Sequence, residues 1–138
     1  MSIEAAIYYE LTNTDAISAL IGTRLYPIAE VPQGTQTEYM TYQRISGPRE
    51  RHQVGAGVCA ARYQFNCYGV TQKEASELGA ALRTKLDRYR DDMGEAGSTI
   101  SVRGAFVQND SDHSTPPTGG TQVGPIWQVV DVIFWYVE

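Results

Sequence analysis

Only two cysteines, Cys59 and Cys67, occur among the 138 residues, and the sequence has no CxxC pair. The two fall eight residues apart within one expected strand, which separates them by about 26 Å, far beyond the reach of a disulfide. We therefore expect two reduced thiols. Cys67 stands on the apolar face of that strand and is interpreted as a core residue. Two cysteines alone do not supply the ligand set of a structural zinc site.

The sequence also lacks a long hydrophobic run and an excess of positive charge. Its most apolar stretch, 129–137, is short and contains Asp131, whereas a membrane-spanning helix needs about twenty apolar residues. The N-terminus carries Glu4 and Glu10 and no basic segment, so we expect no signal peptide and a protein kept in a cytoplasm. The net charge of −5 argues against a general nucleic-acid binder. Four arginines nevertheless cluster loosely in the sequence: Arg44, Arg49, Arg51 and Arg62.

Catalytic signatures are absent, because the chain has no GxSxG, HExxH or P-loop pattern. Residues 55–60 match the dinucleotide pattern GxGxxA, but they precede a strand rather than a helix whose N-terminus would hold phosphate. His52 has no serine or cysteine nucleophile pattern near it. Asp110, Asp112 and His113 could supply ligands to a divalent ion, but without further carboxylates a solvated turn is favoured. We assign no catalytic, cofactor-binding or metal-binding residue and expect no enzyme.

What the sequence does contain is a regular strand joined to a capped, amphipathic helix. Tyr63, Phe65 and Cys67 alternate with polar residues, which is the period of a half-buried strand. Thr71 stands three residues before Glu74 and forms a capping box. The helix that follows has one apolar stripe at three- and four-residue steps, made of Ala75, Leu78, Leu82, Leu86 and Tyr89. The junction lacks a Gly-rich phosphate loop, so this unit is interpreted as structural.

The same criteria divide the rest of the chain into short elements. Helical spacing covers 3–12 and, with Thr14 or Asp15 as cap and Gly22 just past its end, a second helix through Ile21. The helix after Thr71 runs from 72 to about 90. Extended segments are expected at 24–28, 39–46, 58–70, 99–108 and 125–137, and mobile loops at 47–57 and 109–124. These elements predict one α+β domain over 1–138, of order α-α-β-β-α-β-β, with a mostly antiparallel four-stranded sheet and helices packed on one face.

The last strand is apolar on both of its faces. Val130, Val132, Phe134 and Tyr136 share one face, and Trp127, Val129, Asp131, Ile133 and Trp135 share the other. A face of an antiparallel sheet that meets water is normally polar. Something should therefore cover the second face, and the candidates are the N-terminal helices, the long loop or another subunit. The candidate subunit-interface residues are Trp127, Asp131 and Trp135.

Several segments carry a family resemblance when they are read in order along the chain. They are IEAAIYYEL, DAISALIGTRLYP, YMTYQRISG, RYQFNCYG, ASELGAALRTKLD and VVDVIFWYVE, of which residues 22–27 and 42–47 are the most telling. In these segments the chain resembles the tail completion or tail terminator proteins of long-tailed phages and related gene transfer particles. The Pro/Gly-rich loop at 109–124 departs from the pattern and leaves its contacts unassigned.

The resemblance implies a structural virion protein that caps the tail tube as a hexameric ring at the head–tail junction, after assembly in the host cytoplasm. Such a ring would stop tail polymerisation and provide the joining surface for the head connector. Its partners would be other copies of itself, the tail tube protein and the connector or neck proteins. Genomic DNA would pass through the lumen without specific binding, and no membrane or cofactor is implied. The candidate docking residues are Arg49, Arg51, His52, Asp110, Asp112 and His113.

Two other functions stay open at this point. One is a different head–tail joining or neck protein, which small α+β ring proteins resemble in sequence. The other is a small-molecule-binding or enzymatic α+β domain that uses the space between the sheet and the loops. A pocket with a convergent polar cluster would favour the second.

Overall fold

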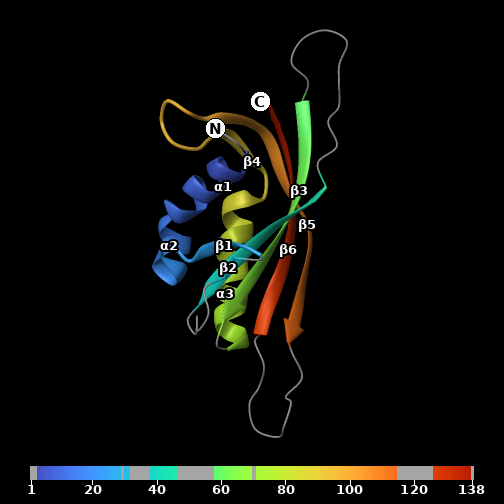
Figure 1. Ribbon diagram of the computed structural model, residues 1–138. Helices are drawn as coiled ribbons and strands as arrows, with labels where there is room; N and C mark the ends of the chain where they lie inside the picture. The colour runs from blue at the N-terminus through green and yellow to red at the C-terminus, as the bar shows by residue number, and fades with distance from the viewer. Residues whose placement is uncertain are drawn as a thin grey trace, which may run out of the picture.

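The computed structural model describes residues 3–28, 30–31, 38–46, 58–69, 71–114 and 126–137. The predicted loop at 47–57 and the part of the second loop after Ser114 lie outside these residues. Three helices and six strands form two layers, with the helices on one side of a long sheet (Figure 1). The elements are α1 (Ile3–Thr12), α2 (Asp15–Ile21), β1 (Leu25–Pro27), β2 (Tyr39–Ser46), β3 (Val58–Gly69), α3 (Gln72–Leu86), β4 (Tyr89–Met93), β5 (Ile100–Ser114) and β6 (Ile126–Val137).

The sheet has the strand order β1-β2-β3-β6-β5-β4, and β1 is parallel to β2 while the other pairs are antiparallel. The α+β class and the placement of the helices on one face are confirmed. The predicted four-stranded sheet and the order α-α-β-β-α-β-β are wrong, because β1 and β4 add a strand at each edge. Three residues in β1 are too few to show a period, and the Arg-Asp-Asp core of β4 has no apolar pattern. Backbone pairing with longer neighbours holds both.

Helix α3 begins as the capping box predicts and ends earlier than its apolar stripe suggests. The Thr71 hydroxyl accepts a hydrogen bond from the backbone N–H of Glu74 at 3.3 Å. The helix stops at Leu86 rather than near residue 90, because Arg88 adopts a left-handed φ of 63° and its N–H donates to the Ala105 carbonyl at 2.7 Å. That bond sends the chain into β4, so Tyr89 belongs to a strand.

The core lies between the helices and the inner face of the sheet. Tyr63, Phe65 and Phe134 meet there with ring centroids 5.9–6.4 Å apart, and the apolar stripe of α3 covers them. Cys59 and Cys67 both lie buried in β3 as free thiols, which confirms the expectation for both. Burial raises the pKa of the Cys67 thiol to about 12, so it is a packing group rather than a nucleophile.

None of the helices in the described part of the chain is long and apolar enough to cross a membrane.

Candidate functional site

The face of the sheet opposite the helices, here called the outer face, carries a row of aromatic side chains across four strands. Trp127 of β6 stacks on Tyr68 of β3 with ring centroids 5.6 Å apart, and Tyr68 stacks on Tyr39 of β2 at 4.6 Å. Tyr39 in turn lies 6.4 Å from Tyr26 of β1. Offset and tilted aromatic pairs of this kind each contribute about 0.5–1.5 kcal/mol beyond their buried area. Trp127 is therefore partly covered by its own subunit.

The N-terminal helices do not cover the outer face, which removes one of the three explanations offered for its tryptophans. The helices lie on the other side of the sheet (Figure 1). Trp135 is half-buried and pairs in register with Ala60 and Gly104. Beside it, Ile133 is half-buried and Phe106 is 44% exposed. The β5–β6 part of the outer face therefore keeps exposed apolar surface within the described structure.

Asp131 lies on the outer face as predicted, but it is already paired inside the subunit. Its Oδ2 atom lies 2.8 Å from the Nη2 atom of Arg62 on β3, and only 8% of the residue is exposed. The pair links two adjacent strands whose residues stand 69 positions apart in sequence. Removing one partner would leave a mostly buried carboxylate uncompensated, which is costly. Asp131 thus links β6 to β3 within the subunit and is not free for a partner.

Asp110 and Asp112 lie in a strand, and this corrects the prediction that residues 109–114 belong to a loop. β5 continues to Ser114, and its last residues pair with Ile126–Asp131 of β6. A polar sequence becomes strand here because the backbone bonds to an apolar partner decide the conformation. His113 also lies in β5, but its side chain is not among the described ones. Arg49, Arg51 and His52 lie entirely outside the described residues.

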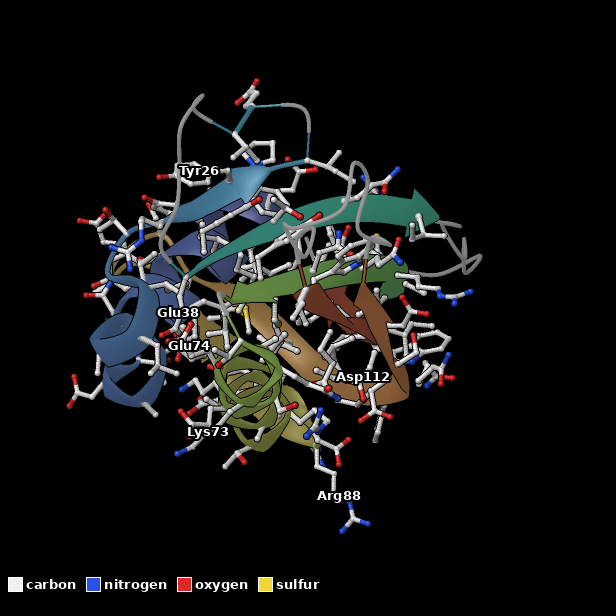
Figure 2. The ribbon with its side chains drawn as sticks, turned by 90° about the horizontal axis from the view of Figure 1, so that it is seen from below. Tyr26, Glu38, Lys73, Glu74, Arg88 and Asp112 are labelled. Carbon is white, nitrogen blue, oxygen red and sulfur yellow. The ribbon has the colours of Figure 1, made fainter. Side chains whose placement is uncertain are left out.

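A chain of polar contacts, here called the clamp, joins α3 to the far end of the β5–β6 hairpin, where residues 110–112 of β5 pair with residues 128–130 of β6. Arg83 Nη1 lies 3.1 Å from Asp110 Oδ2 and donates to Gln128 Oε1 at 2.7 Å. The Gln128 amide then donates to Asp112 Oδ1 at 3.0 Å. Gly79 makes room for this arrangement, since a Cβ there would overlap Gln128 Oε1. Figure 2 shows Asp112 on the hairpin, apart from the aromatic row that begins at Tyr26.

The two aspartates are thus held by a cation and an amide. No cluster of three or more His, Cys, Asp or Glu side chains suited to a metal ion occurs among the described residues.

A polar groove of about 580 Å³ lies between the end of α3 and β5. Asp87 closes one side, because its Oδ1 atom accepts from the Val107 N–H at 3.2 Å. Small-molecule sites are usually enclosed and mostly apolar with a few convergent polar groups. This groove has the opposite character, since its lining residues are Arg83, Thr84, Asp87, Val107, Gln108, Asn109 and Asp110.

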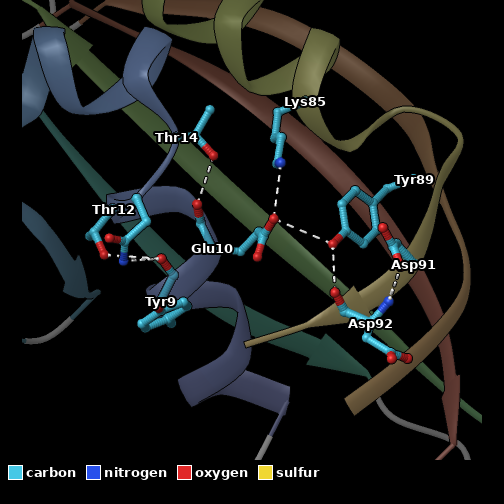
Figure 3. Close-up of polar contacts among 9 residues, drawn as sticks. Tyr9, Glu10, Thr12, Thr14, Lys85, Tyr89, Asp91 and Asp92 are labelled. Carbon is cyan, nitrogen blue, oxygen red and sulfur yellow. Dashed lines mark hydrogen bonds and ion pairs between the residues drawn. The ribbon is translucent and has the colours of Figure 1, made fainter. Parts of the chain in front are cut away.

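A second polar cluster, which the sequence did not reveal, ties the helices to β4 (Figure 3). Glu10 Oε1 of α1 lies 2.9 Å from Lys85 Nζ of α3 and accepts from the Tyr89 hydroxyl at 3.3 Å. The same hydroxyl lies 3.0 Å from the Asp92 carbonyl oxygen, so its single proton is shared between the two acceptors. Burial, followed by the negative charge of Glu10, raises the pKa of Tyr89 above its usual range. The phenol therefore stays protonated and remains a hydrogen-bond donor. This cluster, here called the brace, joins α1, α3 and β4 and has no reacting group.

Near the start of α3, Glu38 lies close to Glu74 (Figure 2). Its Oε2 atom is buried and has no hydrogen-bond partner among the described residues. Burial, and then the charges of Glu74 and Glu77, raise the pKa of the Glu38 carboxyl, while Arg24 lowers it. Arg24 donates to the backbone carbonyl of Glu38 at 2.7 Å rather than to its carboxylate. The carboxylate is thus a cost to the folded state at neutral pH.

Comparison with known proteins agrees with the fold. A family model described as "Tail completion protein gp17" matches residues 5–123. A chain in the solved structure "Virion of native gene transfer agent (GTA) particle" superposes with a TM-score of 0.74 at 16% sequence identity, over 99% of this chain and 95% of that chain. No curated protein matches the sequence. At this identity the solved structure shows a shared fold.

Proposed function

The chain belongs to the tail completion protein gp17 family, a family of structural phage tail proteins, and we propose that it caps a tail tube as a hexameric ring. In this proposal the ring sits at the head–tail junction of a virion, stops tail polymerisation and presents the joining surface for the head connector. Residues 1–138 act as one tail-terminator-like domain, assembled in the host cytoplasm. The observation that carries the proposal is the family match, which runs from α1 past the end of β5.

The physical character of the subunit supports a structural role. On the helix side of the sheet, the core side chains are buried beneath the helices. The outer face, in contrast, keeps partly exposed apolar side chains around Trp135 and Phe106. Such surfaces are typical of interfaces between proteins. We propose that the Trp135 region contributes to contacts in the assembled particle. Trp127 and Asp131, which already have partners in the subunit, would contribute through the shape of the surface.

The charge of the chain suits passage of DNA through a ring. Each copy carries a net charge of −5, so a hexamer carries roughly −30. A lumen lined by this charge would let genomic DNA pass without specific binding. The docking residues that we proposed in the 47–57 loop, Arg49, Arg51 and His52, lie outside the described structure and keep their proposed role.

Growth of tail tubes tests the function directly. Purified tail tube protein is polymerised with and without this chain, and tube lengths and ends are recorded by negative-stain microscopy. The proposal predicts shorter tubes that end in a ring and do not resume growth when fresh subunits are added. A different neck protein would bind the connector and leave tube growth unchanged. Tubes of unaltered length that carry no density at their ends contradict the proposal.

A further inference from the structure

Within the described residues, the short outermost strands leave half of each sheet edge open. β1 pairs only with Met40–Tyr42, so residues 43–46 of β2 have no described neighbour on that side. β4 pairs with β5 only as far as Ala105, so residues 106–114, which pair with β6 on one side, have no described strand on the other. One backbone donor at that edge, the Val107 N–H, already donates to the Asp87 carboxylate. Open edge segments present backbone donors and acceptors on which another strand can pair.

The two open segments carry opposite charges on the same side of the sheet. Arg44 of β2 is in register with the core residue Tyr63, so it points to the helix side, and it is exposed. Asp110 and Asp112 of β5 are in register with Val130 and Gln128, and they also point to the helix side. Each open segment also bears one exposed hydrophobic residue, Ile45 at 43% on β2 and Phe106 at 44% on β5.

We propose that the open edge of β5 in one copy pairs antiparallel with the open edge of β2 in a second copy. β2 and β5 run in opposite directions within the sheet, so two copies in the same orientation meet with antiparallel strands. The helix layers then stay on one side, and Arg44 of one copy approaches Asp112 of the next. Ile45 gains cover at the same joint.

The charge pattern selects this pairing over the pairing of identical edges. Two β5 edges would bring aspartates together, and two β2 edges would bring Arg44 against Arg44, which is repulsive. Joining unlike edges is a head-to-tail contact, the kind that closes into rings. Within one sheet, Arg44 is level with Val107, because Tyr63 and Val132 connect the two in register, whereas Asp112 lies further toward the end of β5. Neighbouring copies are therefore staggered, with strands inclined to the ring axis as in a barrel. Closure into a ring rests on the proposed function, but the pairing does not.

Cross-linking of the two edges tests the pairing. Gln43→Cys and Ser111→Cys place thiols on the outer face of the two open segments, two residues out of register in the proposed pair, and Gln43 is exposed while Ser111 is half-buried. The native cysteines are buried. We expect the double variant, treated with a short bismaleimide, to give a ladder of covalent oligomers at high protein concentration or on tail tubes. Each single variant should give no covalent oligomers. Dimers from a single variant, or no ladder under either condition, would overturn the proposal.

Reversal of charge provides an independent readout. Arg44→Asp and Asp112→Arg should each weaken self-association about tenfold, and the double reversal should restore most of it, because like charges across an interface are unfavourable. Sedimentation velocity measures the association, and thermal melting confirms that each variant folds. Lys73→Glu, at an exposed position on α3, is the matched control and should change association little. Equal association of all four variants, or a double reversal weaker than either single one, would contradict the pairing.

The two experiments separate this inference from the proposed function. If the chain caps tail tubes while the edge cysteines fail to cross-link, the ring uses other surfaces and only the edge pairing falls. If the edges cross-link and tubes still grow past them, the pairing stands and the proposed function falls.

Discussion

The two sides of the sheet differ in how completely the subunit uses them. The helix side buries Tyr63, Phe65 and Phe134 completely beneath the helices, and several of its polar groups are engaged in the clamp and the brace. The outer face keeps half-buried aromatic side chains, and each edge keeps a segment with no described strand on its outer side. The helix side is sufficient to specify the fold. The outer face and the edges are the surfaces that remain for assembly.

A cavity on the helix side should have the largest effect. Leu82 is fully buried in the stripe of α3, so Leu82→Ala should reduce the free energy of unfolding by about 2–5 kcal/mol. Thr84→Ala, at an exposed position of the same helix, is the control and should change it by less than about 0.5 kcal/mol. Urea denaturation measures both. A loss well under about 1 kcal/mol for Leu82→Ala would show that this side is not the core of stability.

The clamp can be tested through the glycine beneath it. In a free helix, Gly79→Ala should add about 1 kcal/mol of stability. Here the new Cβ displaces Gln128 and breaks its bonds to Arg83 and Asp112, each worth about 1 kcal/mol. We expect a net loss of about 1 kcal/mol in the native background.

The same change made in a Gln128→Ala background should instead stabilise the protein, because nothing is displaced. Urea titrations of the four proteins form a double-mutant cycle. If Gly79→Ala changes the free energy of unfolding in the same direction in both backgrounds, Gln128 is not held as the structure shows.

The brace between α1, α3 and β4 should give a smaller effect. Tyr89→Phe removes the hydroxyl that bonds to Glu10 and the Asp92 carbonyl, with an expected loss of about 0.5–1.5 kcal/mol. In a Glu10→Gln background, Tyr89→Phe should reduce the free energy of unfolding by less, because the charged acceptor is gone. Chemical denaturation reports both values. An unchanged loss in that background would show that Tyr89 and Glu10 act independently.

The smallest expected effect concerns the Glu38 carboxyl, whose Oε2 atom has no hydrogen-bond partner among the described residues. Burial raises its folded-state pKa above the unfolded value. The folded protein therefore binds more protons between the two pKa values, and its stability falls as the pH rises through that window. Glu38→Gln should raise the melting temperature at pH 7 and change it little at pH 4.

Glu77→Gln, which removes a charge near Glu38 together with the exposed ion pair to Lys73, is the comparison for Glu38→Gln and should give a smaller increase at pH 7. A Glu38→Gln variant that is less stable than the native protein at pH 7 would show that the carboxylate has a stabilising partner.

Much of the architecture follows from local patterns in the sequence. The bounds of α1, α2 and β2 agree with the predicted ones because clear periods and caps define them. β4 and residues 109–114 of β5 could not be predicted, since their polar side chains signal a turn while backbone pairing to a distant partner makes them strand. The end of α3 was also missed, because a left-handed Arg88 replaces the usual glycine.

The candidate site was less predictable than the fold. Pattern reasoning placed Trp127, Asp131 and Trp135 on one face, which is where they lie. It could not find the partners of Asp131 or Glu10, because Arg62 and Tyr89 stand 69 and 79 residues away in sequence. Contacts of that range depend on sheet order, which no local period encodes. The open edges follow from the same strand order and the same register.

The mass of the native protein, measured by light scattering over a wide concentration range with negative-stain images of the same samples, tests the central claim most directly. The account predicts that subunits associate as concentration rises and that the largest species is a six-membered ring with a central hole. A protein that stays monomeric at every concentration, and that forms no ring on tail tubes added to the same samples, would contradict it.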